Sequence, residues 1–377
     1  MPTSVRWAAR ALVAASLLGL GAATVSACSA ATSGSSTLPP SASHTTGVSP
    51  AAAGAGWIAR DVSSTGAVID AISHKASAGD TADAVLALVA ARFGSNQVTA
   101  ATHWLEHHFG SYVAPSGIDS PGSLGLLILA AVAAGASPTR FGGTSPSNNL
   151  VARLLATERL TGKSAGVFGA PKSANAFSQA LALLALDAVK RIGARTQLGE
   201  TFLARQQCTD GGWEFVRPSL TVGCVAPNPK TYSGPDTNST ALAVMAIVGL
   251  GGKFAHSPVA FFKQAQESNA EFGYYGTAGD GQPGDTDSTA ESLQALIALG
   301  VSKNAEFIRN GITPTNALAR LQYRCTAPPA LRGEFRYAGS PSQLATLQAV
   351  PAIAGVTLPE RHVPLSAAEP RFTCTAS

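Results

Sequence analysis

The segment Asp236-Thr-Asn-Ser-Thr-Ala-Leu-Ala-Val-Met-Ala-Ile-Val-Gly-Leu-Gly251 returns further along the chain as Asp285-Thr-Asp-Ser-Thr-Ala-Glu-Ser-Leu-Gln-Ala-Leu-Ile-Ala-Leu-Gly300. Each copy begins with side chains that cap helices and ends at a glycine, which commonly terminates them. Ala/Leu-rich runs of this kind recur roughly every 50 residues, which predicts one helical unit copied along the chain, each unit packing on the next to bury its apolar face. The runs are 81–94, 123–135, 178–186, 239–251, 288–300 and 342–355.

A second, more amphipathic helix is predicted before each run. No segment shows the convincing apolar/polar alternation of a strand, so the sequence predicts an all-α fold of six helix pairs. Capping signals mark the starts at Asp80, Asp236 and Asp285, and Gly251, Gly300 and Gly355 mark ends. The preceding helices are expected at 57–74, 98–109, 149–160, 197–207, 258–267 and 315–323.

The N-terminal 28 residues have the pattern of an export signal. Arg6 and Arg10 precede the apolar run 11–25, which is short for a transmembrane helix. The quartet Val25-Ser-Ala-Cys28 resembles a bacterial lipobox, which implies cleavage and lipidation of Cys28; the alternative is an ordinary secretory signal cut after Ala27. Residues 1–28 are therefore expected to be a lipoprotein signal that leaves the protein lipid-anchored at the extracytoplasmic face of the cell membrane.

The segment that follows this signal, residues 29–56, contains no Asp, Glu, Lys or Arg and is crowded with Ser, Thr, Ala, Gly and Pro. Such a composition cannot bury much apolar surface, so we expect a flexible tether. Residues 57–377 would then form a single domain with a C-terminal tail.

Four cysteines remain once Cys28 is assigned to lipid, and an exported protein would form two disulfides from them. Three pairings are possible. We favour Cys208 with Cys224, which closes a local loop, and Cys325 with Cys374, which attaches the tail to the last repeat.

Neither metal nor nucleic acid is an expected ligand. No CxxC or Cys/His pair has metal-ligand spacing, and the doublet His107-His108 is expected in a solvated turn. Without Arg6 and Arg10 of the signal, 24 of the 26 basic residues remain, against 22 acidic residues. So small an excess of positive charge does not indicate a nucleic-acid-binding protein. No cofactor is predicted.

One segment resembles a known family. Phe202-Leu-Ala-Arg-Gln-Gln207-Cys-Thr-Asp-Gly-Gly-Trp213 is similar to the Gln-Trp repeat of squalene and oxidosqualene cyclases, and Asp285-Thr-Asp287-Ser-Thr-Ala290 to their Asp-x-Asp-Asp-Thr-Ala box. Phe262 with Gln266, and Leu318 with Gln322 and Phe335, repeat the first pattern more weakly. The resemblance implies an α/α toroid, as in triterpene cyclases, protein prenyltransferase β-subunits, complement thioester domains and cobalamin carriers. Gln207 and Trp213 are interpreted as a staple between successive repeats.

The segment 285–290, which we call the Asp box, is compatible with two classes of function. The resemblance implies that Asp287 is the general acid of a terpene cyclase, with Asp285 beside it. However, Ser288 replaces the third Asp, and the preceding repeat has Asn238 in the middle position, a pattern that favours helix caps. A polyprene cyclase would also normally need a second α-domain and an aromatic cavity, and only 6% of residues are aromatic.

We therefore favour a non-catalytic, membrane-anchored toroid that captures a small amphiphilic ligand, corrinoid-like or isoprenoid, or binds a partner protein that supplies a second domain. The alternative is an enzyme of the terpene cyclase or prenyltransferase type, although the zinc ligands of prenyltransferases have no counterpart here. The expected ligand-binding residues, at the mouth formed by the inner-helix N-termini, are Asp236, Asp285, Asp287, Trp213, Tyr274, Tyr275, Phe335 and Tyr337.

Overall fold

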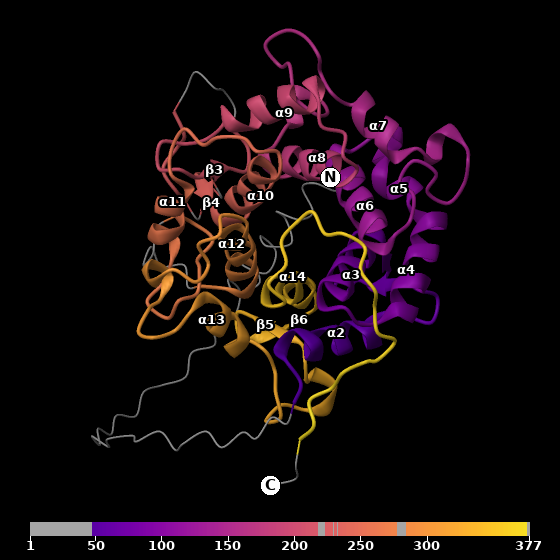
Figure 1. Ribbon diagram of the computed structural model, residues 1–377, viewed down its shortest axis with the longest axis vertical. Coiled ribbons are helices and arrows are strands. Elements are labelled where there is room, and N and C mark those ends of the chain that lie inside the picture. The colour runs from indigo at the N-terminus through magenta and orange to yellow at the C-terminus, as the bar shows by residue number, and fades with distance from the viewer. Residues whose placement is uncertain (1–46, 218–222, 229, 232, 277–283, 375–377) are drawn as a thin grey trace, which may run out of the picture.

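The computed structural model describes residues 47–217, 223–228, 230–231, 233–276 and 284–374, which form an α/α toroid of two concentric rings of helices (Figure 1). Each inner helix packs against the next, and the last, α14, packs against the first, α3, so the inner ring is closed. The predicted fold class is confirmed. The inner helices are α3 (Ala78–Ala91), α6 (Pro121–Ala134), α8 (Ala176–Ala188), α10 (Thr237–Gly249), α12 (Thr286–Ala298) and α14 (Gln343–Ile353).

Outer helices alternate with inner ones along the chain. They are α2 (Pro50–Asp61), α4 (Ser95–His108), α7 (Leu150–Ala156), α9 (Ala194–Ala204), α11 (Pro258–Ala265) and α13 (Pro314–Arg320), with the single turn α5 (Gly110–Val113) after α4. Short 3-10 turns lie in the connections, at Pro115–Gly117, Pro146–Asn148, Pro171–Ser173, Ala305–Phe307 and Pro329–Leu331. Within the described ranges, no helix has both the length and the apolar character needed to cross a bilayer.

Helix α2 corrects two expectations. The tether predicted for 29–56 is wrong over 50–56, because α2 begins at Pro50, where Ser49 caps it by accepting the N–H of Ala52 at 3.2 Å. The small residues of this segment pack into the core, and Ala53 and Ala55 are fully buried. The helix also ends at Asp61, well before the predicted limit of 74. The predicted signal and the Cys28 lipidation site lie outside the described residues.

Three short antiparallel ribbons, not predicted from the sequence, precede three of the inner helices. They pair β1 (Val68–Ile69) with β2 (Ala76–Ser77), β3 (Trp213–Glu214) with β4 (Pro235–Asp236), and β5 (Phe335–Tyr337) with β6 (Ser340–Ser342). In register, Trp213 lies opposite Asp236, and Phe335 lies opposite Ser342. Each ribbon therefore places a loop residue beside the N-cap of an inner helix.

The inner helices all begin at an N-cap residue with the same hydrogen-bond pattern. The side chain of each cap, Asp236 and Asp285 included, accepts the backbone N–H three residues later. Asp80 is an exception to our prediction, because Ser77 caps α3 and Asp80 lies in its first turn. The predicted terminal glycines are confirmed: Gly251, Gly300 and Gly355 have φ of +71°, +72° and +76°, the left-handed conformation that favours glycine.

The predicted staple between repeats is also confirmed. The Gln207 Oε1 accepts the N–H groups of Ala255 and His256 at 2.9 and 3.0 Å, just before α11, and the Trp213 indole donates to the Leu203 carbonyl at 2.9 Å. Gln266 and Gln322 repeat the arrangement. Gln322 donates to the Pro50 carbonyl at 2.8 Å, so the last repeat is joined to the first.

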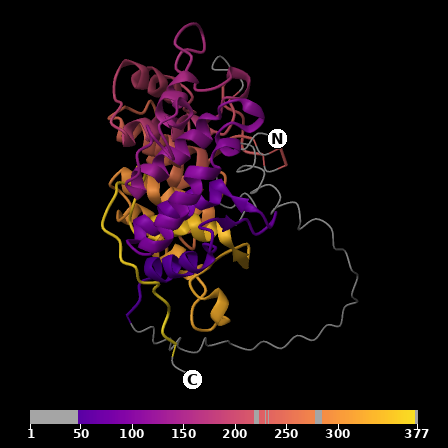
Figure 2. The same ribbon diagram turned by 90° about the vertical axis from the view of Figure 1, so that its right-hand side faces the viewer.

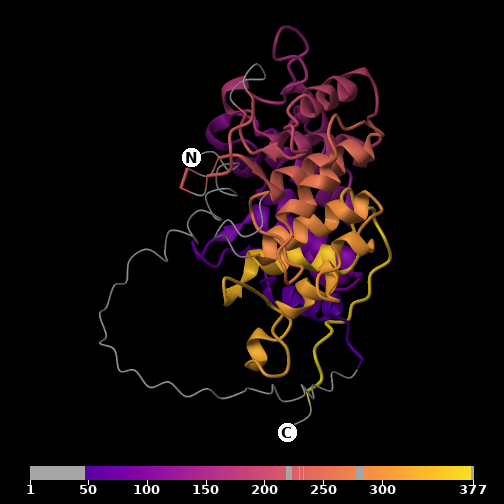
Figure 3. The ribbon, with the colours of Figure 1, turned by 90° about the vertical axis from the view of Figure 1, so that its left-hand side faces the viewer.

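After α14 the C-terminal tail (residues 354–374) runs along one face of the toroid (Figures 2 and 3). Ser366 pairs with the end of α3, donating its N–H to the Arg92 carbonyl at 3.0 Å. The tail then passes so close to α2 that a Cβ on Gly56 would lie 1.7 Å from the Pro370 carbonyl oxygen, which explains a glycine at that position.

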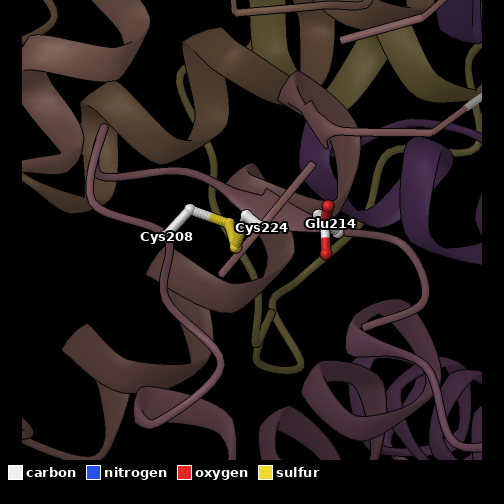
Figure 4. Close-up of side chains that lie close together, drawn as sticks. All are labelled: Cys208, Glu214 and Cys224. Carbon is white, nitrogen blue, oxygen red and sulfur yellow. A yellow bond between two sulfur atoms is a disulfide. The ribbon is translucent and has the colours of Figure 1, made fainter. Parts of the chain in front are cut away.

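Two disulfides have the predicted pairing. Cys325 is joined to Cys374, which attaches the tail to the loop after α13, and Cys208 is joined to Cys224. Glu214 lies beside the second disulfide, and its Oε1 accepts the Val225 N–H at 2.7 Å (Figure 4). These three side chains come within 4.8 Å of one another, but sulfurs bonded to each other offer no thiolate to a metal.

Candidate functional site

Three carboxyl groups gather at the N-terminal half of α12, and we call Asp285, Asp287 and Glu291 the acid cluster. Asp285 is a cap: its Oδ1 accepts the Ser288 N–H at 2.7 Å and its Oδ2 accepts the Ser288 hydroxyl at 2.8 Å. Asp287 is not a cap, contrary to our expectation from the Asn238 repeat. It lies in the first turn, only 9% exposed, and its Oδ1 has no hydrogen-bond partner within the described chain.

Burial raises the pKa of every member of the acid cluster. Burial raises the pKa of Asp287 well above its usual value, and the neighbouring charges of Asp285 and Glu291 raise it further. Burial also raises the pKa of Glu291 to about 7 and that of Asp285 to about 6, although the hydrogen bonds from Ser288 oppose the second shift. Of the three, Asp287 is the acid whose pKa is raised both by burial and by its neighbours in the cluster, which favours its protonated form.

A cavity of about 50 Å³ lies between the inner helices, and side chains from all six of them line it together with the tail. Glu291 lines this cavity, whereas Asp287, one turn closer to the N-terminus of α12, does not. Drug-sized ligand pockets measure about 300 to 1,000 Å³, so the cavity admits only a small group. Its lining is Asp83, Leu86, Leu126, Phe177, Leu181, Leu242, Glu291, Gln294, Leu347, Gln348, Pro351, Leu358 and Glu360.

Three of the aromatic residues expected to bind a ligand are structural instead. Trp213, Tyr275 and Phe335 are 0%, 2% and 0% exposed, so they offer no surface to a ligand and that prediction is wrong. The backbone fixes two of them, because the N–H groups of Trp213 and Phe335 donate to Thr240 and Thr346 on the adjoining inner helices at 2.9 and 2.8 Å.

Tyr274 and Tyr337 are half-buried and remain at the mouth. Burial raises the pKa of Tyr274, and the charges of Asp236 and Asp285 raise it further. The Tyr274 carbonyl accepts the N–H of Thr237, the residue after Asp236, at 2.8 Å, so Tyr274 lies beside the start of α10. Asp236 caps α10 and is itself buried, with a pKa raised by burial to about 7. The structure thus brings together Tyr274, Asp236 and Asp285 of the predicted set, with Asp287 beside Asp285.

Sequence reasoning missed three acids that line the cavity: Asp83, Glu291 and Glu360. Glu291 follows Asp287 by four residues, so helical periodicity alone places both on one face. Glu360 belongs to the tail, and no local pattern indicates that it enters the ring.

Comparison with solved structures shows the same fold in a type II terpene cyclase. The type II terpene cyclase MstE from Scytonema is 15% identical, and the match covers 81% of this chain and 96% of that one with a TM-score of 0.55. The ent-copalyl diphosphate synthase from Streptomyces platensis is 17% identical over 74% of this chain, with a TM-score of 0.47, and this chain spans only 50% of its length. The unsaturated glucuronyl hydrolase from Streptococcus agalactiae is 11% identical over 72% of this chain and 80% of that one, with a TM-score of 0.48.

No protein-family model matches the sequence. No curated protein matches it either. The likeness to MstE extends over nearly the whole of that chain.

Proposed function

We propose that this toroid acts on an isoprenoid as a type II terpene cyclase, with Asp287 as the general acid. The observation that carries the proposal is the environment of Asp287, a buried carboxyl group with a raised pKa and an oxygen that no described residue binds. Leaving a buried polar group unpaired destabilises a fold. Carboxyl groups with strongly perturbed pKa values are typical of functional sites.

In the proposed reaction, the Asp287 carboxyl transfers its proton to one carbon of an alkene. The alkene π electrons form the new C–H bond, the other carbon becomes a carbocation, and Asp287 becomes a carboxylate. The next alkene of the chain attacks the cation to close a ring, and loss of a proton from the final cation gives a neutral product.

Two features of α12 suit Asp287 to this role. Burial and the neighbouring acids hold the proton on Asp287 in the resting protein. The same side chain lies in the first helical turn, where the positive end of the helix dipole stabilises the carboxylate formed by proton transfer. Asn238, the corresponding residue of α10, has no proton to donate.

The small cavity restricts where the substrate can lie. An isoprenoid long enough to cyclise does not fit a space of about 50 Å³, so we place it at the N-terminal mouth, against Tyr274 and Tyr337. Aromatic faces attract cations, and each contact contributes about 0.5 to 2 kcal/mol. We also retain the proposal that Cys28 anchors the protein at the extracytoplasmic membrane surface, where apolar isoprenoids would be concentrated.

Because the cavity is too small to enclose a cyclising isoprenoid, we keep a second candidate function. In this function the mouth binds an amphiphilic ligand or a partner protein without converting it. Incubation of the purified protein with squalene, geranylgeranyl diphosphate and geranylgeranyl dihydroxybenzoate, the substrate named in one MstE complex, separates the two. Gas chromatography with mass spectrometry detects any cyclised product.

We expect Asp287→Asn to remove a product that wild type and the outer-helix control Glu106→Gln both form. The loss should be several orders of magnitude, because the amide has no acidic proton. Product that persists in Asp287→Asn would exclude this residue as the acid. Binding without product in wild type would establish capture instead.

A further inference from the structure

Three acids line the central cavity, and two of them have no part in the proposed reaction. These two are Asp83 of α3 and Glu360 of the tail, and the third is Glu291 of α12. Glu360 is 4% exposed, and neither of its carboxyl oxygens has a hydrogen-bond partner within the described chain. The Glu291 Oε2 and the Gln348 Oε1 also lack partners there. Several acceptors therefore face one cavity.

No Lys, Arg or His is among the residues that line this space. A buried acceptor that lacks a donor destabilises the protein unless a proton, a water molecule or a cation satisfies it. Burial raises the pKa of Glu360 well above its usual value, which favours the protonated form of this side chain. A cation that entered the cavity could take the place of a proton on one of these acids.

The spacing of the acids indicates the kind of cation. Calcium contacts oxygen at about 2.4 Å, so oxygens that share one bare ion lie within about 4.8 Å of one another. Among the described residues, the one group of three potential ligands that meets this limit is Cys208, Glu214 and Cys224. The three cavity acids are thus too widely spaced to ligate one bare metal ion together.

An ammonium group suits the chemistry of the lining, because it donates charge-assisted hydrogen bonds of about 2.7 to 2.9 Å to carboxyl and amide oxygens. The remaining lining is mostly apolar, with Leu126, Leu181 and Leu242 among its members. A cavity of about 50 Å³ has room for on the order of four water molecules, hence for a short alkyl chain.

We propose that the central cavity is a binding site for a primary alkylammonium ion, with Glu360 and Glu291 as its principal acceptors and the leucines around its alkyl chain. The site differs from the Asp287 mouth and does not rest on the proposed cyclase activity. Because a cation joins protonated acids, one ion should displace about one proton.

The affinity should therefore increase from pH 6 to pH 8. The titratable groups that face the cavity are Asp83 from α3, Glu291 from α12 and Glu360 from the tail, with Asp287 one turn beyond Glu291. The side chains that α6, α8, α10 and α14 contribute to the lining do not titrate.

Isothermal titration of the purified protein with ethylammonium chloride at pH 8 tests the site. Two amine-free buffers with different ionisation enthalpies give the number of protons released. Ethanol is the neutral isostere, and calcium chloride tests for a metal. We expect ethylammonium to bind with release of about one proton, and ethanol and calcium to give no saturable heat.

Glu360→Gln and Glu291→Gln should each weaken ethylammonium binding at least tenfold, whereas Glu106→Gln on the outer helix α4 should bind like wild type. Thermal unfolding checks that each variant is folded. If Glu360→Gln does not fold, the affinity of Glu291→Gln for ethylammonium tests the proposal instead. The proposal is overturned if wild type fails to bind ethylammonium, if both glutamine variants bind as tightly as wild type, or if calcium binds in its place.

Discussion

Replacing Glu291 by Gln should make the protein more stable at alkaline pH, and the structure gives the size of the effect. Glu291 is buried in the ring, and burial raises its pKa from 4.5 to about 7. The folded state therefore holds this proton more tightly than the unfolded state does. Wild type loses stability as the pH rises from 4.5 to about 7, because the folded chain must then either bury a charge or keep a proton that the unfolded chain releases.

The shift of about 2.5 units corresponds to about 3 kcal/mol, at 1.36 kcal/mol per unit. Gln has the size of Glu and does not titrate. The difference in unfolding free energy between Glu291→Gln and wild type should therefore change by about 3 kcal/mol in favour of the variant between pH 4.5 and pH 8.

Urea unfolding followed by circular dichroism, in amine-free buffers at several pH values, measures this difference. Glu106→Gln is the control and should follow wild type throughout. If the unfolding free energies of Glu291→Gln and wild type have the same pH dependence, the side chain is not buried with its proton, and the basis for the cavity site is lost as well.

Other predictions concern the closure of the ring and the anchor. Gln322→Ala removes the hydrogen bond to the Pro50 carbonyl and leaves it unsatisfied, so we expect a loss of about 1 to 3 kcal/mol in urea unfolding; a loss no larger than that of an exposed Gln→Ala change would contradict the staple. Cys325→Ser with Cys374→Ser opens a loop of 49 residues and should cost about 4 kcal/mol, against about 3 kcal/mol for Cys208→Ser with Cys224→Ser, whose separation is 16; the reverse order would disagree with the chain-entropy estimate. Cys28→Ala should release the protein from membranes and abolish labelling by a fatty acid, and a variant that stays membrane-bound would argue against the lipid anchor.

The sequence predicts the inner ring well because each inner helix has its own local signals. The caps Asp236 and Asp285 and the terminal glycines Gly251 and Gly300 act within a few residues of the helices they bound. The N-terminal half of the first outer helix was not predicted, because the Ala- and Gly-rich stretch that includes Ala53 has the composition of a linker. It becomes a helix through packing against α3 and α14, and α14 lies at the other end of the chain.

The candidate site, too, could be predicted from the sequence only in part. The Asp box predicts the position of Asp285 and Asp287, because both lie on one helical turn. The environment of Asp287 depends on tertiary burial, which the sequence pattern does not contain. Trp213 and Phe335 were expected at the mouth as loop aromatic residues, whereas both side chains are buried and their backbone N–H groups donate to Thr240 and Thr346. The entry of Glu360 into the ring follows from the path of the whole tail.

The contacts that join α2 to α14, and the tail to the loop after α13, affect how the chain can fold. An open solenoid can grow one repeat at a time, each new unit stacking on a finished one. Here the first helix packs on the last, and the disulfide partner of Cys325 is residue 374. The toroid therefore cannot close until residue 374 has been synthesised. Contacts between such distant residues slow folding, so chaperones would bind rings that have not yet closed, and mild denaturants should unfold the repeats together rather than from one end.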